Sequence, residues 1–484
     1  MIEEKDLNQD KTNDTEQKIA DDYIKYEFAE KNGYVKFIEP NGDIYEGYVV
    51  DGKKEGQGKI IFANGTTYIG KFKNNEIDGY GTCKFSSGNT YTGDLVYSKE
   101  RNLAIKHGKG TMSWANGGKY EGDFINDLKD GNGKMFFANG DIYEGSWKND
   151  EINGKGKIIW SNGDTYSGEW KNGKLDGYGK FSSNEGELVL YEGYFLGSKR
   201  TGKGKAVYKN GVIYDGEWKN NLFDGQGEYA TADNNFCYKG NFVSGTFDGY
   251  GELLDNGNKY CGQFKKDKKC GIGILYYKSK AIYQGYWEDN RQHGEGTYIY
   301  PNGDRYSGSL VNGKFEGKGV MCRIDGSTYI GDFTDDKKEG KGKIIYRNGA
   351  YYEGDMKDNE MTGKGVFRFY DGGIYEGDFI NSCFNGNGKL TLPSGTVYVG
   401  SFKDNQYNGN GTIKYGENSG AANEKFVGTW LDGKMKKGTY TYADGSSYIG
   451  EFSDNKKNGF GIEKDANGNI VKSGIWKDNE FIDW

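Results

Sequence analysis

A motif of about 23 residues recurs along almost the whole chain and decides what the chain can fold into. The motif reads Tyr-x-Gly-x-aromatic, then a polar turn, Gly-x-Gly, a short apolar stretch and a turn of the Asn-Gly kind. One copy contains Tyr143, Gly145, Trp147 and Gly156, and the next copy begins at Tyr166. Eleven of the 18 intervals between copies are 23 residues long, a regularity that chance does not produce. The chain is therefore expected to be an array of one short unit.

The nineteen copies share a first position that is almost always tyrosine. These first positions are Tyr45, Tyr68, Tyr91, Tyr120, Tyr143, Tyr166, Tyr191, Tyr214, Tyr238, Tyr260, Tyr283, Tyr306, Tyr329, Tyr352, Tyr375, Tyr398, Phe426, Tyr448 and, in a degenerate last copy, Lys472.

Each copy is predicted to form a β-hairpin. Alternation with a period of two places Tyr143, Gly145 and Trp147 on one face of the first strand, with polar residues on the other face. A second strand follows the Gly-x-Gly. Asn-Gly pairs such as Asn64-Gly65 are predicted to be two-residue hairpin turns, in which both central residues need a positive φ.

Glycine is unusually abundant for a strand-rich chain, at 81 of 484 residues. A strand glycine lacks a Cβ, so an aromatic ring can lie flat over its backbone. The rings of the repeat are therefore predicted to cover the glycines and to stabilise the array through contacts between neighbouring repeats. The aromatic residues singled out for this structural role are Tyr143, Trp147, Trp170, Tyr214, Trp218, Trp287 and Trp430.

Charge and composition limit the function classes. The formal net charge is −7, and residues 1–22 alone contribute eight acids against three lysines. This balance predicts no nucleic-acid partner. No apolar run reaches the roughly 20 residues that cross a bilayer, and no apolar stretch near the N-terminus suggests a secretion signal. The six cysteines are scattered, as expected of reduced thiols in a cytoplasmic protein.

Candidate catalytic residues are few. The two histidines, His107 and His293, both stand directly before the first glycine of a Gly-x-Gly, so one repeat position explains both. The segment Gly197–Lys203 resembles a phosphate-binding loop, but Gly204 occupies the place of the Ser or Thr that would hold magnesium. No metal-ligand cluster stands out. We therefore expect a non-enzymatic protein without cofactors.

The recurring Tyr-x-Gly-x-(Trp/Phe) and Gly-x-Gly pattern resembles the MORN (membrane occupation and recognition nexus) repeat, over about residues 45–484. The resemblance implies an all-β fold: an elongated, single-layer, twisted antiparallel sheet, here a solenoid-like array of about 19 tandem β-hairpin repeats. It also implies a groove and, often, a homodimer. Family members scaffold cytoskeletal or membrane-contact structures, including radial-spoke heads of cilia and ring or basal-complex structures of apicomplexan parasites.

Departures from the motif define the expected boundaries. Residues 1–22 are predicted to be a flexible acidic tail, 23–44 a degenerate N-terminal capping repeat, 45–471 the tandem repeats, and 472–484 a degenerate C-terminal repeat or cap. The apolar residues Trp476, Phe481 and Trp484 near the C-terminus have two interpretations, a cap or an exposed surface for self-association.

Two functions are consistent with the sequence. The first is a structural scaffold or adaptor of a cytoskeletal assembly, with the ciliary axoneme as the most specific candidate and its component proteins as partners. The second is a peripheral membrane adaptor that binds phosphoinositides weakly through the basic segments Lys265–Lys269 and Lys434–Lys437. In both cases binding is expected along a groove lined by the repeat tyrosines or at the Phe481/Trp484 end.

Overall fold

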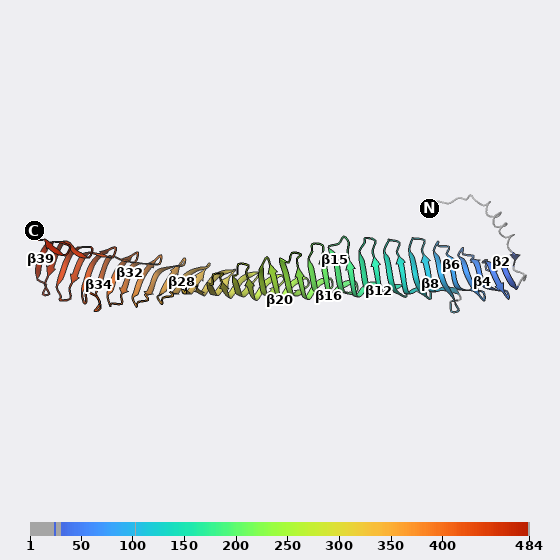
Figure 1. The fold of residues 1–484 in the computed structure, drawn as a ribbon, viewed down its shortest axis with the longest axis horizontal. Helices are drawn as coiled ribbons and strands as arrows, with labels where there is room; N and C mark the ends of the chain where they lie inside the picture. Colours follow the sequence, from blue (N-terminus) through green and yellow to red (C-terminus); the bar gives the residue numbers. More distant parts are fainter. Residues whose placement is uncertain (1–23, 26–30, 102, 483–484) are drawn as a thin grey trace, which may run out of the picture. The chain divides into compact units, whose positions relative to one another are not determined.

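A computed structural model describes residues 24–25, 31–101 and 103–482, and all the regular structure in these ranges is β-strand. The chain divides into two compact units, residues 1–245 and residues 246–484. Within each unit the strands follow one another in chain order, as Figure 1 shows. Each described unit is a single-layer sheet, which confirms the predicted all-β array of hairpins. The predicted tail, residues 1–22, lies outside the described residues.

The first unit holds nineteen strands. They are β1 (Ile24–Lys25), β2 (Asn32–Ile38), β3 (Ile44–Val50), β4 (Lys53–Ile61), β5 (Thr67–Lys73), β6 (Glu76–Lys84), β7 (Thr90–Ser98), β8 (Leu103–Ser113), β9 (Lys119–Ile125), β10 (Leu128–Phe136), β11 (Ile142–Lys148), β12 (Glu151–Ile159), β13 (Thr165–Lys171), β14 (Lys174–Ser182), β15 (Leu188–Leu196), β16 (Lys199–Tyr208), β17 (Ile213–Lys219), β18 (Leu222–Ala230) and β19 (Phe236–Val243). All described neighbours in this unit pair antiparallel, except that β1 runs parallel to β2.

The second unit holds twenty-one strands, paired antiparallel in chain order. They are β20 (Thr246–Asp255), β21 (Asn258–Lys265), β22 (Lys268–Tyr276), β23 (Ile282–Glu288), β24 (Arg291–Ile299), β25 (Arg305–Val311), β26 (Lys314–Cys322), β27 (Thr328–Thr334), β28 (Lys337–Ile345), β29 (Tyr351–Lys357), β30 (Glu360–Arg368), β31 (Ile374–Ile380), β32 (Cys383–Thr391), β33 (Val397–Lys403), β34 (Gln406–Lys414), β35 (Lys425–Leu431), β36 (Lys434–Thr441), β37 (Ser447–Ser453), β38 (Lys456–Lys464), β39 (Ile470–Lys477) and β40 (Glu480–Ile482).

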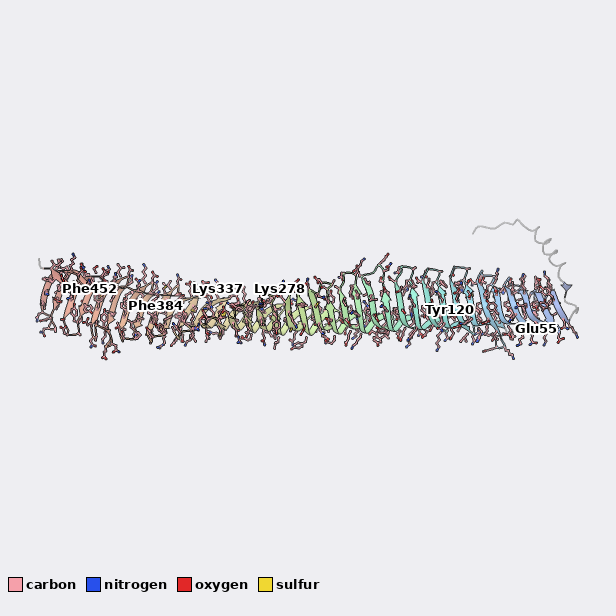
Figure 2. The ribbon with its side chains drawn as sticks, in the orientation of Figure 1. Glu55, Tyr120, Lys278, Lys337, Phe384 and Phe452 are labelled. Carbon is pink, nitrogen blue, oxygen red and sulfur yellow. The ribbon has the colours of Figure 1, made fainter. Side chains whose placement is uncertain are left out.

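The pairing register places the repeat glycines side by side. Gly145 on β11 pairs with Gly156 on β12, and Gly156 pairs in turn with Gly168 on β13. A shift of register follows Gly145, where β12 carries extra residues opposite β11. Side chains along each strand alternate in direction, so the repeat tyrosine and the aromatic residue four positions later lie on one face of the sheet. Figure 2 shows that side chains project along the whole length of the described strands.

The repeat contains two kinds of turn, and the turn at the Asn-Gly pairs differs from the predicted one. At Asn64-Gly65 only Gly65 has a positive φ, +81°, so the prediction of a two-residue turn here is wrong. The loop spans three residues, closed by the Phe62 N–H donating to the Thr66 carbonyl at 2.8 Å. Asn64 acts through its side chain, whose Oδ1 accepts the Thr66 N–H at 2.9 Å. Two-residue turns with positive φ at both positions instead follow the aromatic strand, as at Asn149 (49°) and Asp150 (70°).

No helix that could span a membrane occurs in the described ranges.

Candidate functional site

The repeat tyrosines form the buried centre of each hairpin. Tyr143 is 0 % exposed, and its hydroxyl donates to the Ser146 carbonyl at 3.0 Å. A Cβ built on Gly156 would lie 2.2 Å from the Tyr143 hydroxyl oxygen, so the ring rests directly on the glycine backbone. The prediction that rings cover glycines is confirmed. Burial raises the pKa of Tyr143 to about 12.

The rings of successive repeats contact one another edge to face. The Tyr143 ring lies 5.3 Å from the Trp147 ring and 5.6 Å from the Trp170 ring, with interplanar angles near 90°. Aromatic pairs favour this geometry. Most rings therefore bridge two repeats, and we call this row of rings within a unit the ring ladder. In some repeats another apolar side chain takes the place of a ring, as at Leu95, Leu310 and Met356.

The other predicted aromatic residues are also internal to the ring ladder. Each tryptophan indole N–H donates to the carbonyl of a Gly-x-Gly glycine in the preceding hairpin, between 2.8 and 3.4 Å away. The buried set comprises Trp147, Trp170, Tyr214, Trp218, Trp287 and Trp430.

The residue nine positions after the repeat tyrosine lies over the rings of the ladder, and we call it the lid residue. Arg200 is one such residue, and its guanidinium carbon lies 4.4 Å from the Trp218 ring centre. At the same position Phe223 stacks on Tyr214 at 3.8 Å, and Lys269 lies 5.4 Å from the Tyr260 ring centre. Burial lowers the pKa of Lys269. The only sequence signal was a large apolar or cationic residue at this position.

The covered rings overturn the expectation of a tyrosine-lined groove. The glycine backbone lies beneath each ring, neighbouring rings flank it, and a lid residue lies over it, so a partner cannot reach the tyrosines.

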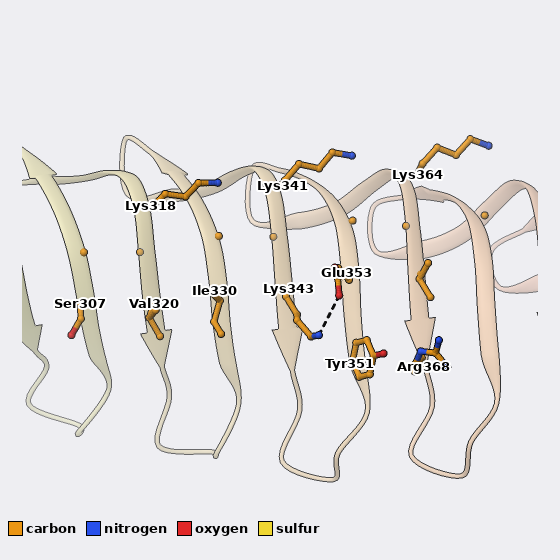
Figure 3. A pocket seen from close by; sticks show the side chains of 18 of the residues that line it. Ser307, Lys318, Val320, Ile330, Lys341, Lys343, Tyr351, Glu353, Lys364 and Arg368 are labelled. Carbon is orange, nitrogen blue, oxygen red and sulfur yellow. Dashed lines mark hydrogen bonds and ion pairs between the residues drawn. The ribbon is translucent and has the colours of Figure 1, made fainter.

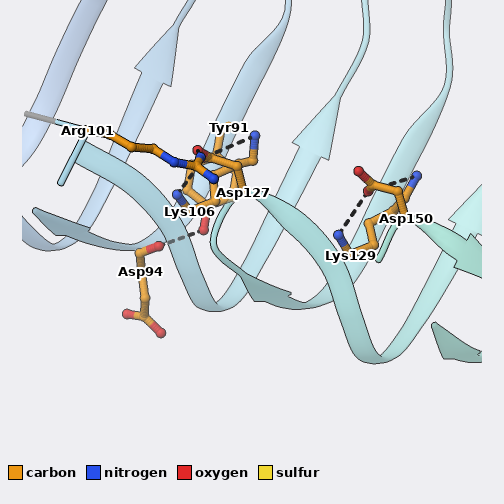
Figure 4. Close-up of polar contacts among 7 residues, drawn as sticks. All are labelled: Tyr91, Asp94, Arg101, Lys106, Asp127, Lys129 and Asp150. Carbon is orange, nitrogen blue, oxygen red and sulfur yellow. Dashed lines mark hydrogen bonds and ion pairs between the residues drawn. The ribbon is translucent and has the colours of Figure 1, made fainter. Parts of the chain in front are cut away.

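A second contact that the sequence analysis missed joins many of the repeats to the preceding one. Asp150, in a two-residue turn, accepts the Lys129 N–H at 2.9 Å, and the Asp150 N–H donates to the Lys129 carbonyl at 3.0 Å. Asp127 makes the same two contacts with Lys106 and also pairs with Arg101 at 3.2 Å (Figure 4). In the sequence, this contact is indicated by Asn, Asp or Ser at the second position of the two-residue turn.

The face opposite the ring ladder of the second unit carries a groove. Two hollows of about 930 and 1190 Å³ share Glu295, Ser307 and Gly308, so they form one depression from Ile272 to Gly377. Figure 3 shows part of it, with the side chains of Val320 and Ile330 on neighbouring strands. The groove runs across the strands.

The floor of the groove is uncharged over five consecutive strands. Cross-strand pairing aligns one residue from each of β23 to β27. The Thr297 and Ser307 hydroxyls lie 3.0 Å apart and satisfy each other. Beyond them the charged pair Lys343–Glu353 continues the floor at 3.2 Å. The uncharged floor residues are Gln284, Thr297, Ser307, Val320 and Ile330.

One wall of the groove is a ladder of lysine–aspartate pairs. Lys318 lies 2.6 Å from Asp332, and the same pairing recurs one repeat later. The Lys318 ammonium holds the pKa of Asp332 below its usual range. Asp332 also accepts the Lys341 N–H at 3.2 Å, which ties the carboxylate to the backbone of the next strand. The recurring pairs are Lys318–Asp332, Lys341–Asp355 and Lys364–Asp378.

The other wall is mixed apolar and cationic. It contains Ile299, Arg305, Tyr351 and Arg368. The Arg368 guanidinium carbon lies 5.9 Å from the Tyr351 ring centre. At the start of the groove Ile272 is 66 % exposed and Tyr286 is 47 % exposed. Large exposed apolar side chains in one depression are typical of a protein-binding surface.

The equivalent face of the first unit differs in charge. Its central row contains ion pairs such as Lys134–Glu144 at 3.2 Å and Lys180–Glu192 at 3.6 Å. These pairs neutralise the surface within the chain. An uncharged row also occurs in this unit, where Ile69, Thr82, Thr92 and Thr111 align on β5 to β8.

The remaining predicted binding residues have internal partners. Trp476 is buried, and its ring centre lies 5.3 Å from that of half-buried Phe481, so both belong to the last hairpin. Trp484 lies outside the described residues. In the basic segments Lys268 pairs with Asp289 at 3.1 Å and Lys437 with Glu451 at 3.8 Å.

The residues considered for chemistry are not brought together. His293 lies 3.5 Å from Glu288, and six free cysteines lie on separate strands. In the described part of the chain no group of three or more His, Cys, Asp or Glu side chains could hold a metal ion.

The geometry defines a class of protein: a repeat-built, single-layer β-sheet with a groove on one face. The MORN repeat family matches this chain eighteen times, and the chain belongs to that family. The matched residues are 45–67, 68–90, 105–119, 120–142, 143–165, 166–187, 191–213, 214–236, 238–259, 260–281, 283–305, 306–328, 329–351, 352–374, 375–397, 398–419, 426–447 and 448–470. MORN repeats suggest a protein-binding or membrane-associated scaffold, and the family is generally non-enzymatic.

Other comparisons add little. No curated protein matches the chain. Among solved structures, the TCP10 domain of Danio rerio CPAP in complex with a STIL peptide is 12 % identical, with 57 % of this chain and 98 % of that chain covered and a TM-score of 0.15. The SAS-4 TCP domain of Drosophila melanogaster is 14 % identical, with coverage of 42 % and 85 % and a TM-score of 0.17. Scores this low support no argument about function.

Proposed function

We propose that this protein is a non-catalytic scaffold that holds a segment of a partner protein in the groove of its second unit. The observation that carries the proposal is the uncharged floor between a wall of lysine–aspartate pairs and a mixed apolar and cationic wall, on the face that the ring ladder leaves open. Recognition surfaces commonly combine a dry centre with a polar rim. Membership of a family of scaffolds supports the same conclusion.

We further propose that the partner belongs to a cytoskeletal assembly in the cytoplasm or cilium, with an axonemal complex as the most specific candidate. The support is the array of eighteen repeats between residues 45 and 470, which suits a spacer or scaffold better than an enzyme. The alternative, a phosphoinositide-binding adaptor, has weaker support, because acidic residues neutralise lysines in both basic segments.

Replacing Ile330 by Asp tests the groove. Ile330 is 46 % exposed on the floor, so a carboxylate there, opposite Lys343, should leave the sheet folded and place a new charge under any apolar partner. We expect affinity purification of tagged full-length protein to recover its partners at a level lower by about tenfold or more, since burying a charge under an apolar partner costs several kcal/mol. The identity of the lost proteins, cytoskeletal or not, tests the assembly.

The matched control is Ile69→Asp. Ile69 occupies the same repeat position on the first unit, one residue after Tyr68, and is 53 % exposed. The Ile69→Asp protein should retain the partners that the Ile330→Asp protein loses. Equal retention by wild type and Ile330→Asp would contradict the proposal.

A further inference from the structure

We infer that the segment held in this groove is an acidic amphipathic α-helix of the partner. This inference rests on the proposed function and adds the chemistry of the occupant. It follows from three features of the groove: the pairing of its strands, its width and spacing, and two arginines without a carboxylate partner.

The strands under the groove are already fully paired within the sheet. Strands β25 to β30 each have a hydrogen-bonded neighbour on both sides. A partner in extended conformation could not add to a sheet edge there, and where it crosses Val320 and Ile330 its backbone N–H and C=O groups would lie unpaired. A helix satisfies those groups internally.

The dimensions of the groove match a helix. On β25 the two walls and the floor are represented by Arg305, Ser307 and Ser309, which point to the same face. Two residues along a strand span about 6.7 Å, so the walls lie about 13 Å apart. A helix with its side chains is about 10–12 Å wide. Its turns rise about 5.4 Å, close to the strand spacing of about 4.8 Å, so each turn can meet one floor residue.

The two arginines favour an acidic helix, although Glu295, which lines both hollows, adds one carboxylate to the groove. Four lysines of the groove are paired with carboxylates, as described above. Within the described residues, no carboxylate oxygen lies within 4.0 Å of the guanidinium groups of Arg305 and Arg368, and both arginines are exposed. Guanidinium groups bind carboxylates in a two-pronged geometry, and they favour such partners over isolated apolar groups.

The two arginines are too far apart for one lipid headgroup. Arg305 is on β25 and Arg368 on β30, five strand spacings or about 24 Å along the groove. That distance corresponds to about 16 residues of helix. A helix with an apolar stripe and carboxylates near both ends satisfies both arginines and the floor together.

Selection of binders tests the inference. A display library of random 20-residue peptides is selected on the full-length protein. We expect enriched sequences to show apolar residues at helical spacing with net negative charge, and to become helical on binding by circular dichroism. Arg305→Gln with Arg368→Gln should weaken their binding about tenfold and reduce its salt dependence. The control, Lys155→Gln with Lys203→Gln in the first unit, should leave binding unchanged.

The outcomes separate this inference from the proposed function. One outcome is that the peptides lose binding to Ile330→Asp and yet are basic, extended or indifferent to the two arginines. In that case the groove remains the binding site, and the inference of an acidic helix is wrong. If Ile330→Asp has no effect, or the selection yields no groove-dependent peptide, both fail. Arginine-dependent sedimentation of the protein with vesicles containing 5 % phosphatidylinositol 4,5-bisphosphate, with no peptide competition, would also overturn the acidic helix.

Discussion

Replacing Trp218 by alanine should destabilise the first unit by about 3–5 kcal/mol, the usual cost of deleting a buried tryptophan. Trp218 is 3 % exposed, its indole N–H donates to the Gly204 carbonyl at 2.8 Å, and its ring contacts those of Tyr191 and Tyr214 edge to face. Its removal opens a cavity in the ring ladder and takes away the nearer of the two rings that the lid residue Arg200 covers.

The loss should appear in only part of the melting profile. Repeat arrays owe their stability to neighbouring contacts, so damage in one repeat spreads only locally. Differential scanning calorimetry of the full chain should show one transition move to lower temperature while the remainder keeps its midpoint. Tyr194→Ala is the control, because Tyr194 lies on the opposite face at 48 % exposure. An unchanged melting profile for Trp218→Ala would contradict the claim that the ring ladder stabilises the array.

Replacing Gly156 by alanine should have the second-largest effect on stability. The new Cβ would lie 2.2 Å from the Tyr143 hydroxyl oxygen and 2.5 Å from its ring carbon, distances at which the ring must move. The Tyr143 ring has no free space, because it is 0 % exposed and contacts Trp147 and Trp170. Overpacking of this kind costs about 1–3 kcal/mol.

Denaturant unfolding at neutral pH measures this cost against a matched substitution. Gly420→Ala is the control, because a Cβ on Gly420 meets no atom within 4 Å. The midpoint should fall for Gly156→Ala and stay within error for Gly420→Ala. Equal midpoints for the two variants would show that the ring does not rest on Gly156.

The sequence was sufficient for the hairpin and for the contact of Tyr143 with Gly156, because alternation and the absence of a Cβ both act within one repeat. The turn at Asn64 was mispredicted because Asn-Gly serves two turn types, and the choice depends on whether the asparagine adopts a positive φ or accepts a hydrogen bond through its side chain. Local sequence does not distinguish the two.

The sequence analysis did not predict the lid residues or the groove, and the reason differs between the two. Lid residues such as Arg200 and Phe223 share a position but no chemical type, so no motif reveals them. The sequence shows which face carries the rings, but not that lids close it. The groove floor joins residues 10 and 13 positions apart, such as Ser307, Val320 and Ile330, and their common neutrality emerges only when the register is known.

The central claim is that the face opposite the ring ladder in the second unit binds the partner. An amine-reactive photo-cross-linker on the complex purified from cells tests it directly. Lys318, Lys341 and Lys364 stand at the groove wall, and Lys109, Lys155 and Lys203 occupy the same repeat position in the first unit. We predict that mass spectrometry finds partner cross-links concentrated on the three groove lysines. Cross-links spread equally over both sets, or concentrated on the first unit, would contradict the account.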